Sequence, residues 1–463
     1  MNVVPYIIGI FVIVVGLAVS IALHEIGHLV PAKKFGVRVG QYMIGFGPTL
    51  FSRKVGETQY GVKAIPLGGY ISMAGMYPPT AAEKAAQVEG AARGDGADSA
   101  SGGSAHRSGK AGGGFFATMV QDARSANDET LQGEDDERVF YKLPVYKRVI
   151  IMLGGPVMNL LLAIVLFTVL FSAIGLQQGT TTVSAVSQCV LPAGSTQTEC
   201  ASSDPVAPAA AAGMRPADVI VSVDGTPVST FDEASEIVRA SPGVALDIVV
   251  ERDGMQMPLQ ITPVAADRPT YGDNGQPLVD AAGAPVTEEV GFVGMSPVVG
   301  FIQQPIWTGP QTAFENVGAV AGIIVQLPVK LYETAVSLFT GGERDPNGPL
   351  SVVGVGLIAG EVASQDTPVL SRVAGVIGLL GSLNIALFVF NLVPLLPLDG
   401  GHIVVALWEG VKRVWAKIFR RPPPKPVDAT KLVPVTFVVV ILLIGMGGLL
   451  VLADIFNPVQ LFN

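Results

Sequence analysis

The chain has 463 residues, of which 49% are hydrophobic and only 14% are charged, and its formal net charge is −9 at pH 7. This composition excludes an ordinary soluble globular protein and predicts a protein that crosses a membrane several times. The lipid bilayer is therefore an expected partner, and no nucleic-acid partner is expected.

Four apolar segments are long enough to span a membrane, at residues 4–23, 149–176, 373–393 and 432–453. The first segment has no basic residue before it and no small-residue cleavage site after it, so we expect a retained helix rather than a signal peptide. Basic residues instead follow the first span and fill the loop between the third and fourth spans. The positive-inside rule then places these loops in the cytoplasm and both termini outside.

The first span ends in the motif His24-Glu25-Ile26-Gly27-His28. Residues four apart lie on one face of a helix, so both imidazoles can bind one Zn²⁺ while Glu25 reaches the water on the metal. The same pattern also occurs by chance on surface helices, where its charged residues simply face solvent. That alternative is disfavoured because no charged residue precedes His24, and ionisable residues in a lipid-adjacent helix are costly unless they bind something or line a cavity.

A second motif, NLVPLLPLDGGH, lies at the end of the third span and begins at Asn391. A catalytic zinc uses three protein ligands and keeps one position open, and Asp399 is the best-placed carboxylate to complete the set. Pro394 and Pro397 interrupt the helix, which is tolerated at membrane depth around a buried site. The alternative is an interfacial turn in which Asp399 is solvated.

Together these motifs resemble those of the site-2 proteases, which are intramembrane zinc metalloproteases, and specifically the bacterial PDZ-containing group of the regulator of sigma-E protease type. The resemblance covers the motifs HEIGH at 24–28, GFGP at 45–48, IPLGGY at 65–70, GGPVMN at 154–159 and NLVPLLPLDG at 391–400. It implies that His24, His28 and Asp399 hold zinc and that Glu25 is the general base. It also implies that Asn391 helps to hold the substrate backbone or its oxyanion.

Residues 35–73 alternate apolar and polar side chains and contain many glycines, which predicts short strands and hairpins. In the family this looks like a membrane-associated β-hairpin region, and we expect Gly45, Phe46, Gly47 and Pro48 within it to bind the substrate. An exposed strand edge would pair with the backbone of an unwound substrate. A purely structural hairpin that plugs the bundle is the alternative.

Two asparagines and two cysteines each leave two interpretations open. Asn159 and Asn384 lie in apolar spans and serve either the site or the packing of helices. Cys189 and Cys200 fall in the predicted exported region, where a disulfide is permitted, and two free thiols are the alternative.

The expected fold is a polytopic α-helical membrane protein with four transmembrane helices, a membrane-associated β-hairpin region and one extracytoplasmic PDZ domain. The PDZ assignment comes from the segment 208–228, which resembles a PDZ domain of the bacterial protease type. Alternating residues at 246–251 and 259–261 and helical spacing at 231–240 agree with it. In chain order we expect a first transmembrane helix with HExxH (1–34), the β-hairpin region (35–77), a disordered cytoplasmic insertion (78–138), a second transmembrane helix (139–176), the PDZ domain with an N-terminal insertion (177–270), an extracytoplasmic membrane-surface helical region (271–372), a third transmembrane helix with NxxPxxPLDG (373–402), a basic cytoplasmic loop (403–431), and a fourth transmembrane helix with the C-terminus (432–463).

The resemblance implies an intramembrane zinc metalloendopeptidase of the bacterial cell membrane, with one Zn²⁺ per chain and an active site toward the cytoplasmic side. Its expected substrate is a single-pass membrane protein such as an anti-sigma factor, already trimmed by an upstream site-1 protease. A remnant signal peptide is the alternative substrate, and a catalytically silent membrane PDZ scaffold is the alternative class. The joint presence of Glu25, both histidines and Asp399 disfavours the scaffold. The sequence leaves open whether the PDZ groove binds peptides or acts as a size filter.

Overall fold

A computed structural model describes residues 3–76, 137–191, 197, 199–270, 278, 286–422 and 432–459 of the chain. Its contacts divide the chain into two compact units, one made of Met1–Leu170 and Ile306–Asn463 and the other of Phe171–Pro305. The predicted insertion at 78–138 lies outside the described residues, except for its last two positions.

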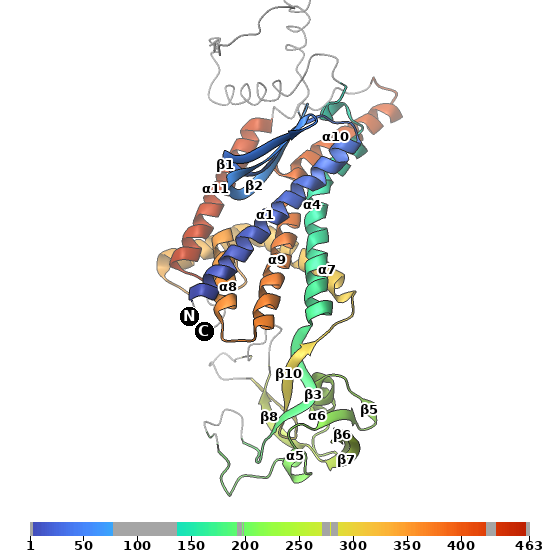
Figure 1. Ribbon diagram of the computed structural model, residues 1–463, viewed down its shortest axis with the longest axis vertical. Coiled ribbons are helices and arrows are strands. Elements are labelled where there is room, and N and C mark those ends of the chain that lie inside the picture. Colours follow the sequence, from blue (N-terminus) through green and yellow to red (C-terminus); the bar gives the residue numbers. More distant parts are fainter. Residues whose placement is uncertain are drawn as a thin grey trace, which may run out of the picture. The chain divides into compact units, whose positions relative to one another are not determined.

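The first unit is a helical bundle in which α1 packs against α4 and α8, and α4 packs against α9 and α10 (Figure 1). The helices are α1 (Val3–Lys34), α4 (Val145–Thr168), α7 (Thr308–Thr340), α8 (Val352–Ser364), α9 (Val369–Asn391), α10 (Asp399–Ile418) and α11 (Val433–Phe456). A π-helical turn, Val169–Ile174, continues α4. The apolar contacts between α1, α8 and α9 centre on the buried side chains of Ile13, Ala359 and Val376.

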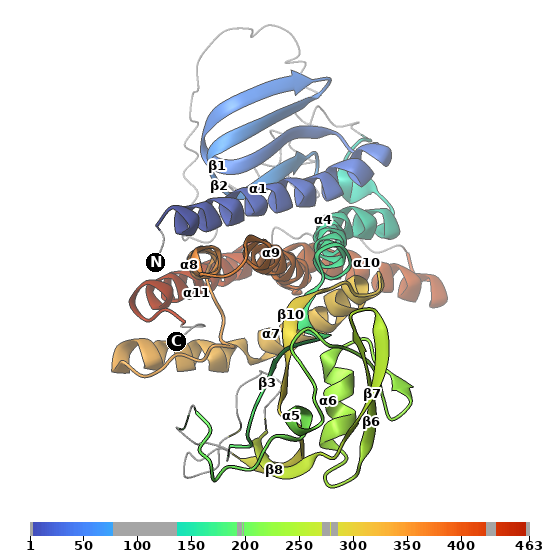
Figure 2. The same ribbon diagram turned by 60° about the horizontal axis from the view of Figure 1, so that its bottom comes forward.

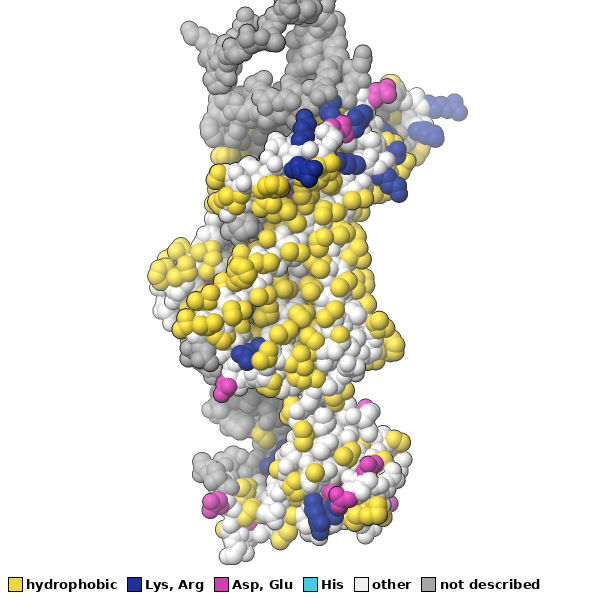
Figure 3. All heavy atoms as spheres, viewed as in Figure 1, with side chains coloured by type: hydrophobic (Ala, Val, Ile, Leu, Met, Phe, Trp, Pro, Cys, Tyr) yellow, Lys and Arg dark blue, Asp and Glu magenta, His cyan; other side chains and the backbone are white. Residues whose placement is uncertain are grey.

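Five helices in the described part of the chain are long and apolar enough to cross a membrane. Four of them, at Val3–Lys34, Val145–Ile174, Val369–Asn391 and Pro434–Phe456, overlap the four predicted spans. The fifth is Thr308–Thr340, which is the least apolar of the five, contains Pro328 and was expected to lie on the membrane surface. On the face seen in Figure 3, apolar side chains cover the helical part of this unit, and Lys and Arg side chains gather at the end that carries β1, β2 and α10. The chain is therefore a membrane protein with several candidate spans.

The predicted strands at 35–73 form one sheet from β1 (Val39–Val55) and β2 (Thr58–Met73). Both strands bend, so that each contributes two runs. Met43 pairs with both Gly61 and Tyr70, and Gly61 also pairs with Ser52. The run at 69–73 is therefore an edge of the sheet. Figure 2 shows the sheet on one side of α1 and the other helices on its opposite side.

The second unit is an α/β fold around a six-stranded sheet. Its central order is β10-β3-β4-β6-β7, with β5 paired to β4, and β8 and β9 form a separate ladder. The elements are β3 (Leu176–Val186), α5 (Pro208–Ala211), β4 (Val219–Val223), β5 (Thr226–Pro227), α6 (Phe231–Arg239), β6 (Leu246–Arg252), β7 (Met255–Ile261), β8 (Val264–Pro269), β9 (Thr287–Phe292) and β10 (Met295–Ile302). Thr230 and Glu233 form a capping box at the start of α6, and Ile220, Val223 and Ile248 lie in the core.

Two segments differ from the expected organisation. Residues 271–372 were expected to form a helical region, but β9 and β10 within this range are strands of the second unit. β10, at the end of the unit's sequence, pairs with β3 at its beginning, as between Phe301 and Gln177. The helix of the third expected span, 373–393, ends at Asn391, before the two prolines that were expected to interrupt it. Most of the expected basic loop at 403–431 is instead occupied by α10. The disulfide that the sequence left open is present between Cys189 and Cys200.

Candidate metal centre

The HExxH motif lies where α1 touches α4. A Cβ atom on Gly27 would lie 2.2 Å from the carbonyl oxygen of Gly154, so the two helix backbones meet directly at this point. Small residues permit such close approach between helices in an apolar bundle. The contact fixes the turn of α1 that carries His24 and His28.

The structure brings the three predicted metal ligands together. The Nε2 atoms of His24 and His28 are 3.2 Å apart, and they lie 3.3 and 3.4 Å from Oδ2 of Asp399. No other group of three His, Cys, Asp or Glu side chains with this geometry occurs among the described residues. Two motifs at opposite ends of the chain therefore share one site.

Asp399 reaches this position because it is the first residue of α10, directly after the broken segment 392–398. A Cβ atom on Gly400 would lie 2.4 Å from the carbonyl oxygens of Leu392 and Val393, so only glycine fits where the chain folds back on the end of α9. A carboxylate in the first turn of a helix also interacts favourably with the helix dipole.

Each histidine has a partner on α4 for its other ring nitrogen. His28 Nδ1 lies 2.7 Å from the carbonyl oxygen of Ile151, which requires Nδ1 to carry the proton and leaves the Nε2 lone pair free. His24 Nδ1 lies 3.1 Å from Nδ2 of Asn159, while the buried Oδ1 of Asn159 has no hydrogen-bond partner. Rotating this amide by half a turn places Oδ1 as the acceptor for His24 Nδ1–H and leaves Nε2 of His24 unprotonated. Both imidazoles are then held with Nε2 directed at the shared position.

This donor set fits a zinc ion. Oδ2 of Asp399 is buried without a hydrogen-bond partner and faces two imidazole nitrogens. A buried carboxylate oxygen in such a position calls for a cation. Two nitrogen ligands and one oxygen ligand, with a fourth position open, are the set found in catalytic zinc sites, and the Nδ1 partners are typical of metal-binding histidines.

Two glycines line the site, and sequence reasoning noted them only as parts of motifs. Gly155 lies against both imidazoles, because a Cβ atom there would be 2.2 Å from Nε2 of His28. Gly69, in the edge run of β2, lies against Glu25, because its Cβ atom would be 3.0 Å from Cγ of Glu25. Glu25 itself is 8% exposed. The paired glycines of GGPVMN and IPLGGY were the available signal for these contacts.

The predicted substrate-binding residues contact other parts of the fold rather than the three ligands. Phe46 of the GFGP segment packs on Gly68, the residue before Gly69, and Gly45 and Gly47 have positive φ angles of 90° and 83°. Asn391 ends α9, and its Nδ2 donates to the carbonyl oxygen of Leu387 in the same helix. Within the described residues, no hydrogen bond or ion pair joins Asn391 or residues 45–48 to the three ligands.

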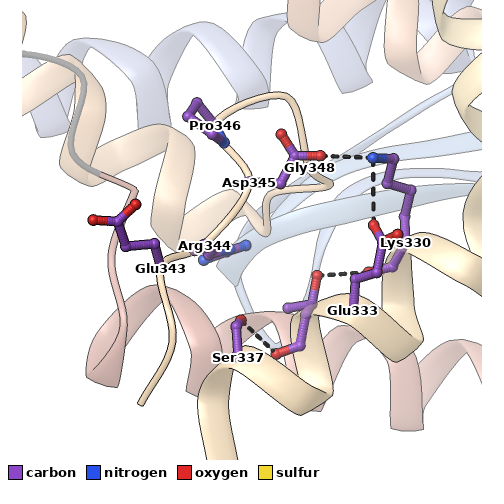
Figure 4. Close-up of a pocket in the computed structure, with 9 residues that line it drawn as sticks. Lys330, Glu333, Ser337, Glu343, Arg344, Asp345, Pro346 and Gly348 are labelled. Atoms are coloured by element: carbon purple, nitrogen blue, oxygen red, sulfur yellow. Dashed lines mark hydrogen bonds and ion pairs between the residues drawn. The ribbon is translucent and has the colours of Figure 1, made fainter. Parts of the chain in front are cut away.

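A separate cavity of about 400 Å³ lies between α7 and the loop before α8 (Figure 4). Its charged side chains other than Glu343 pair with one another or with α11. Lys330 contacts Asp345 at 2.6 Å and Glu333 at 3.4 Å, and Arg344 binds Asp454. These pairs tie the end of α7 to α11 and indicate a structural role.

Comparison with known proteins agrees with this chemistry. Residues 12–428 match peptidase family M50. The zinc metalloprotease Rip1 of Mycobacterium tuberculosis strain H37Rv is 33% identical over 99% of this chain and 100% of its own length, and Rip1 of Mycolicibacterium smegmatis is 32% identical over 98% and 99%. A putative zinc metalloprotease of Brucella suis is 28% identical over 86% of this chain and 84% of its own. The predicted resemblance to site-2 proteases is confirmed: the chain belongs to peptidase family M50 and is a zinc metalloprotease of the membrane.

Proposed function

We propose that His24, His28 and Asp399 hold the zinc ion and that Glu25 is the general base of an intramembrane endopeptidase. The observation that carries this proposal is the convergence of the two Nε2 atoms and Oδ2 on one point, beside a buried Glu25. Ile151 and Asn159 keep both histidines in the tautomer that binds metal.

The proposed mechanism divides the work between the ion and the protein. A bound zinc supplies a Lewis acid that polarises the scissile carbonyl and acidifies a water molecule. Glu25 takes a proton from the attacking water at its carboxylate and then delivers it to the nitrogen of the leaving amine. The side-chain amide of Asn391 is the proposed donor to the developing oxyanion once substrate binding draws it away from Leu387.

The edge of the β sheet supports strand addition as the way the substrate is presented. Within the described residues, the run at 69–73 has strand partners on one side only, in β1. Gly69 in this run touches Glu25. A substrate strand added beside this run would have its unwound backbone groups paired, as a low-dielectric environment requires, next to the proposed base. Gly45–Pro48 would support this run through the contact of Phe46 with Gly68.

Contacts within the first unit support four spans, with α7 on the outer surface and both termini outside. Gly309 at the start of α7 lies against Thr168 at the end of α4. Beyond the other end of α7, Arg344 binds Asp454 near the end of α11. Asp454 also accepts hydrogen bonds from the start of α8, and Gly360 in α8 lies against Tyr6 near the start of α1. The two ends of α7 thus contact helix termini that share one side in the four-span arrangement.

The second unit is proposed to be an extracytoplasmic PDZ domain. Its disulfide supports an oxidising compartment. A cavity of about 250 Å³ lies between α6 and residues 290–295 and has space for the end of an extended peptide. The proposed substrate is a single-pass membrane protein of the anti-sigma type, cut after an upstream site-1 protease has removed its exported part, and a remnant signal peptide is the second candidate. A test in cells compares an intact with a pre-trimmed tagged substrate, and equal cleavage of both would contradict the need for a first cut.

The catalytic assignment is tested by Glu25→Gln, which keeps the shape of the side chain and removes its basicity. Wild type is expected to cut a tagged single-pass substrate and Glu25→Gln to leave it intact, while both purified proteins hold about one zinc per chain. Glu251→Gln, an exposed substitution in β6, is the matched control and should cut normally. Equal cleavage by Glu25→Gln and wild type would refute the role of Glu25. Asp399→Asn should lower the zinc content itself.

A further inference from the structure

The helix α10 carries an apolar face that no described part of the chain covers. Six large side chains on one face are between 50% and 69% exposed: Leu407, Trp408, Val411, Val414, Trp415 and Ile418. Their spacing of three, four and seven residues places them side by side on one stripe of the helix. A stripe of this size on the surface of a protein marks a surface that contacts an apolar partner.

The opposite face of α10 is fixed to the bundle. Ala406, Glu409 and Ala416 are buried, and Glu409 forms an ion pair of 2.9 Å with Arg148 of α4. Since the side chains of Glu409 and Arg148 are both buried, this pair fixes the rotation of α10 about its axis. The apolar stripe therefore points away from α4.

Basic residues accompany the stripe. Lys412, Arg413 and Lys417 lie within the helix and Arg420 and Arg421 follow it, whereas Asp399 and Glu409 are the acidic residues of this segment. Both acidic residues are engaged, Asp399 with the histidines and Glu409 with Arg148 and Arg413. The side of α10 that faces away from the bundle is thus apolar in the middle and positively charged at its borders and its end.

We propose that α10 lies in the surface of the bilayer, with its apolar stripe among the acyl chains and its basic residues on anionic lipid headgroups. The bilayer is the occupant favoured by the structure because α10 packs against α4, which is an apolar candidate span of the same unit. Trp408 and Trp415 suit the interface between acyl chains and headgroups, and Lys412 and Lys417 on either border of the stripe can extend to phosphate. The charges in the helix oppose a full crossing of the membrane.

This position has a consequence for the metal centre, which rests on the proposed role of Asp399. α10 begins at Asp399, and the Glu409–Arg148 pair holds the helix to α4, which also carries the histidine partners. A helix held at the membrane surface keeps its first residue at a constant depth relative to α1. Anionic lipid is therefore expected to support cleavage as well as to bind α10.

The experiment uses tryptophan fluorescence of the full-length protein in lipid nanodiscs. The chain has three tryptophans, so Trp307→Phe leaves only the two of α10 as reporters. Nanodiscs of phosphatidylcholine, with or without phosphatidylglycerol, carry a quencher either near the headgroups or at the end of the acyl chains. We expect stronger quenching by the shallow quencher than by the deep one, and a further increase when phosphatidylglycerol is present.

Lys412→Glu with Lys417→Glu should abolish the response to phosphatidylglycerol in quenching and in cleavage while leaving the zinc content unchanged. Lys412→Gln with Lys417→Gln should give an intermediate response. Absence of quenching by either lipid-borne quencher would refute membrane contact and assign the stripe to a protein partner, and quenching that ignores phosphatidylglycerol would refute recognition of anionic headgroups. Since fluorescence reports on α10 without zinc or cleavage, failure of the Asp399 assignment would show separately, as unchanged zinc content in Asp399→Asn.

Discussion

Asn159 is expected to control zinc affinity without touching the metal. Its side chain is 1% exposed and lies 3.1 Å from His24 Nδ1. In Asn159→Ala the Nδ1–H of His24 loses its acceptor inside the protein, so the tautomer with Nε2 free is no longer favoured. Loss of such a partner weakens metal binding or activity by roughly 10- to 100-fold, which corresponds to about 1.4–2.7 kcal/mol.

The assay is competition for zinc between purified protein and a chelator of known affinity, with cleavage measured at saturating zinc. Asn159→Asp should retain zinc binding, because a carboxylate also accepts the Nδ1 proton. Asn384→Ala is the matched control: this asparagine is also buried in an apolar helix, but it donates to Ser20 and Leu380. The control should lower stability without changing zinc affinity. Wild-type zinc affinity in Asn159→Ala, or lost affinity in Asn159→Asp, would refute the proposed amide orientation.

Two further predictions concern one unit each. Gly155→Ala would place a Cβ atom 2.2 Å from Nε2 of His28 and should displace the ligands and remove zinc, whereas Gly447→Ala in α11, which has open space around it, should leave zinc content and cleavage intact. In the second unit, burial alone would raise the pKa of Asp218, but hydrogen bonds, chiefly from Arg252, outweigh it and lower the pKa. The resulting stabilisation is present above the unfolded pKa of about 3.9 and is lost as pH falls through the lower folded value. The protection of β4 and β6 amides against hydrogen exchange, measured in the intact protein, should therefore be higher in wild type than in Asp218→Asn at neutral pH and become equal in strong acid. A difference in protection that stays constant at all pH values would contradict this linkage.

The sequence predicted those site residues whose chemical type is unusual for their position in the chain. His24 and His28 stand out because ionisable side chains are costly in an apolar helix, and Asp399 stands out because two prolines and two glycines surround it. The structure places the three within one cluster. The alternation at 35–73 likewise predicted strands, which β1 and β2 confirm, although the bent register with Met43 between Gly61 and Tyr70 has no local signal.

What the sequence could not predict depends on contacts between distant segments. The carbonyl oxygen of Ile151 carries no side-chain signature, so its bond to His28 becomes visible only when α1 and α4 are packed. β10 and β3 pair although they lie at opposite ends of the second unit's sequence. The apolar pattern of β10 alone suits a surface helix equally well. For α10, the density of basic residues suggested a loop, although the three- and four-residue spacing of apolar residues from Leu407 to Ile418 is a local helical signal. What the sequence could not show is the ion pair between Glu409 and Arg148, which fixes the side of the helix that faces α4.

Residues of α4 hold the ligands of the metal centre in position, although α4 contributes no ligand itself. α1 supplies both imidazoles, but their Nδ1 atoms are held by Ile151 and Asn159, and α10 is held by Arg148, all three on α4. Gly154 and Gly155 let α4 approach closely enough to make these contacts. A substitution on α4 should therefore change zinc affinity more often than one at the same depth on α9, even though neither helix contributes a ligand, because rigid support from the surrounding shell keeps ligands within the narrow geometry that zinc requires.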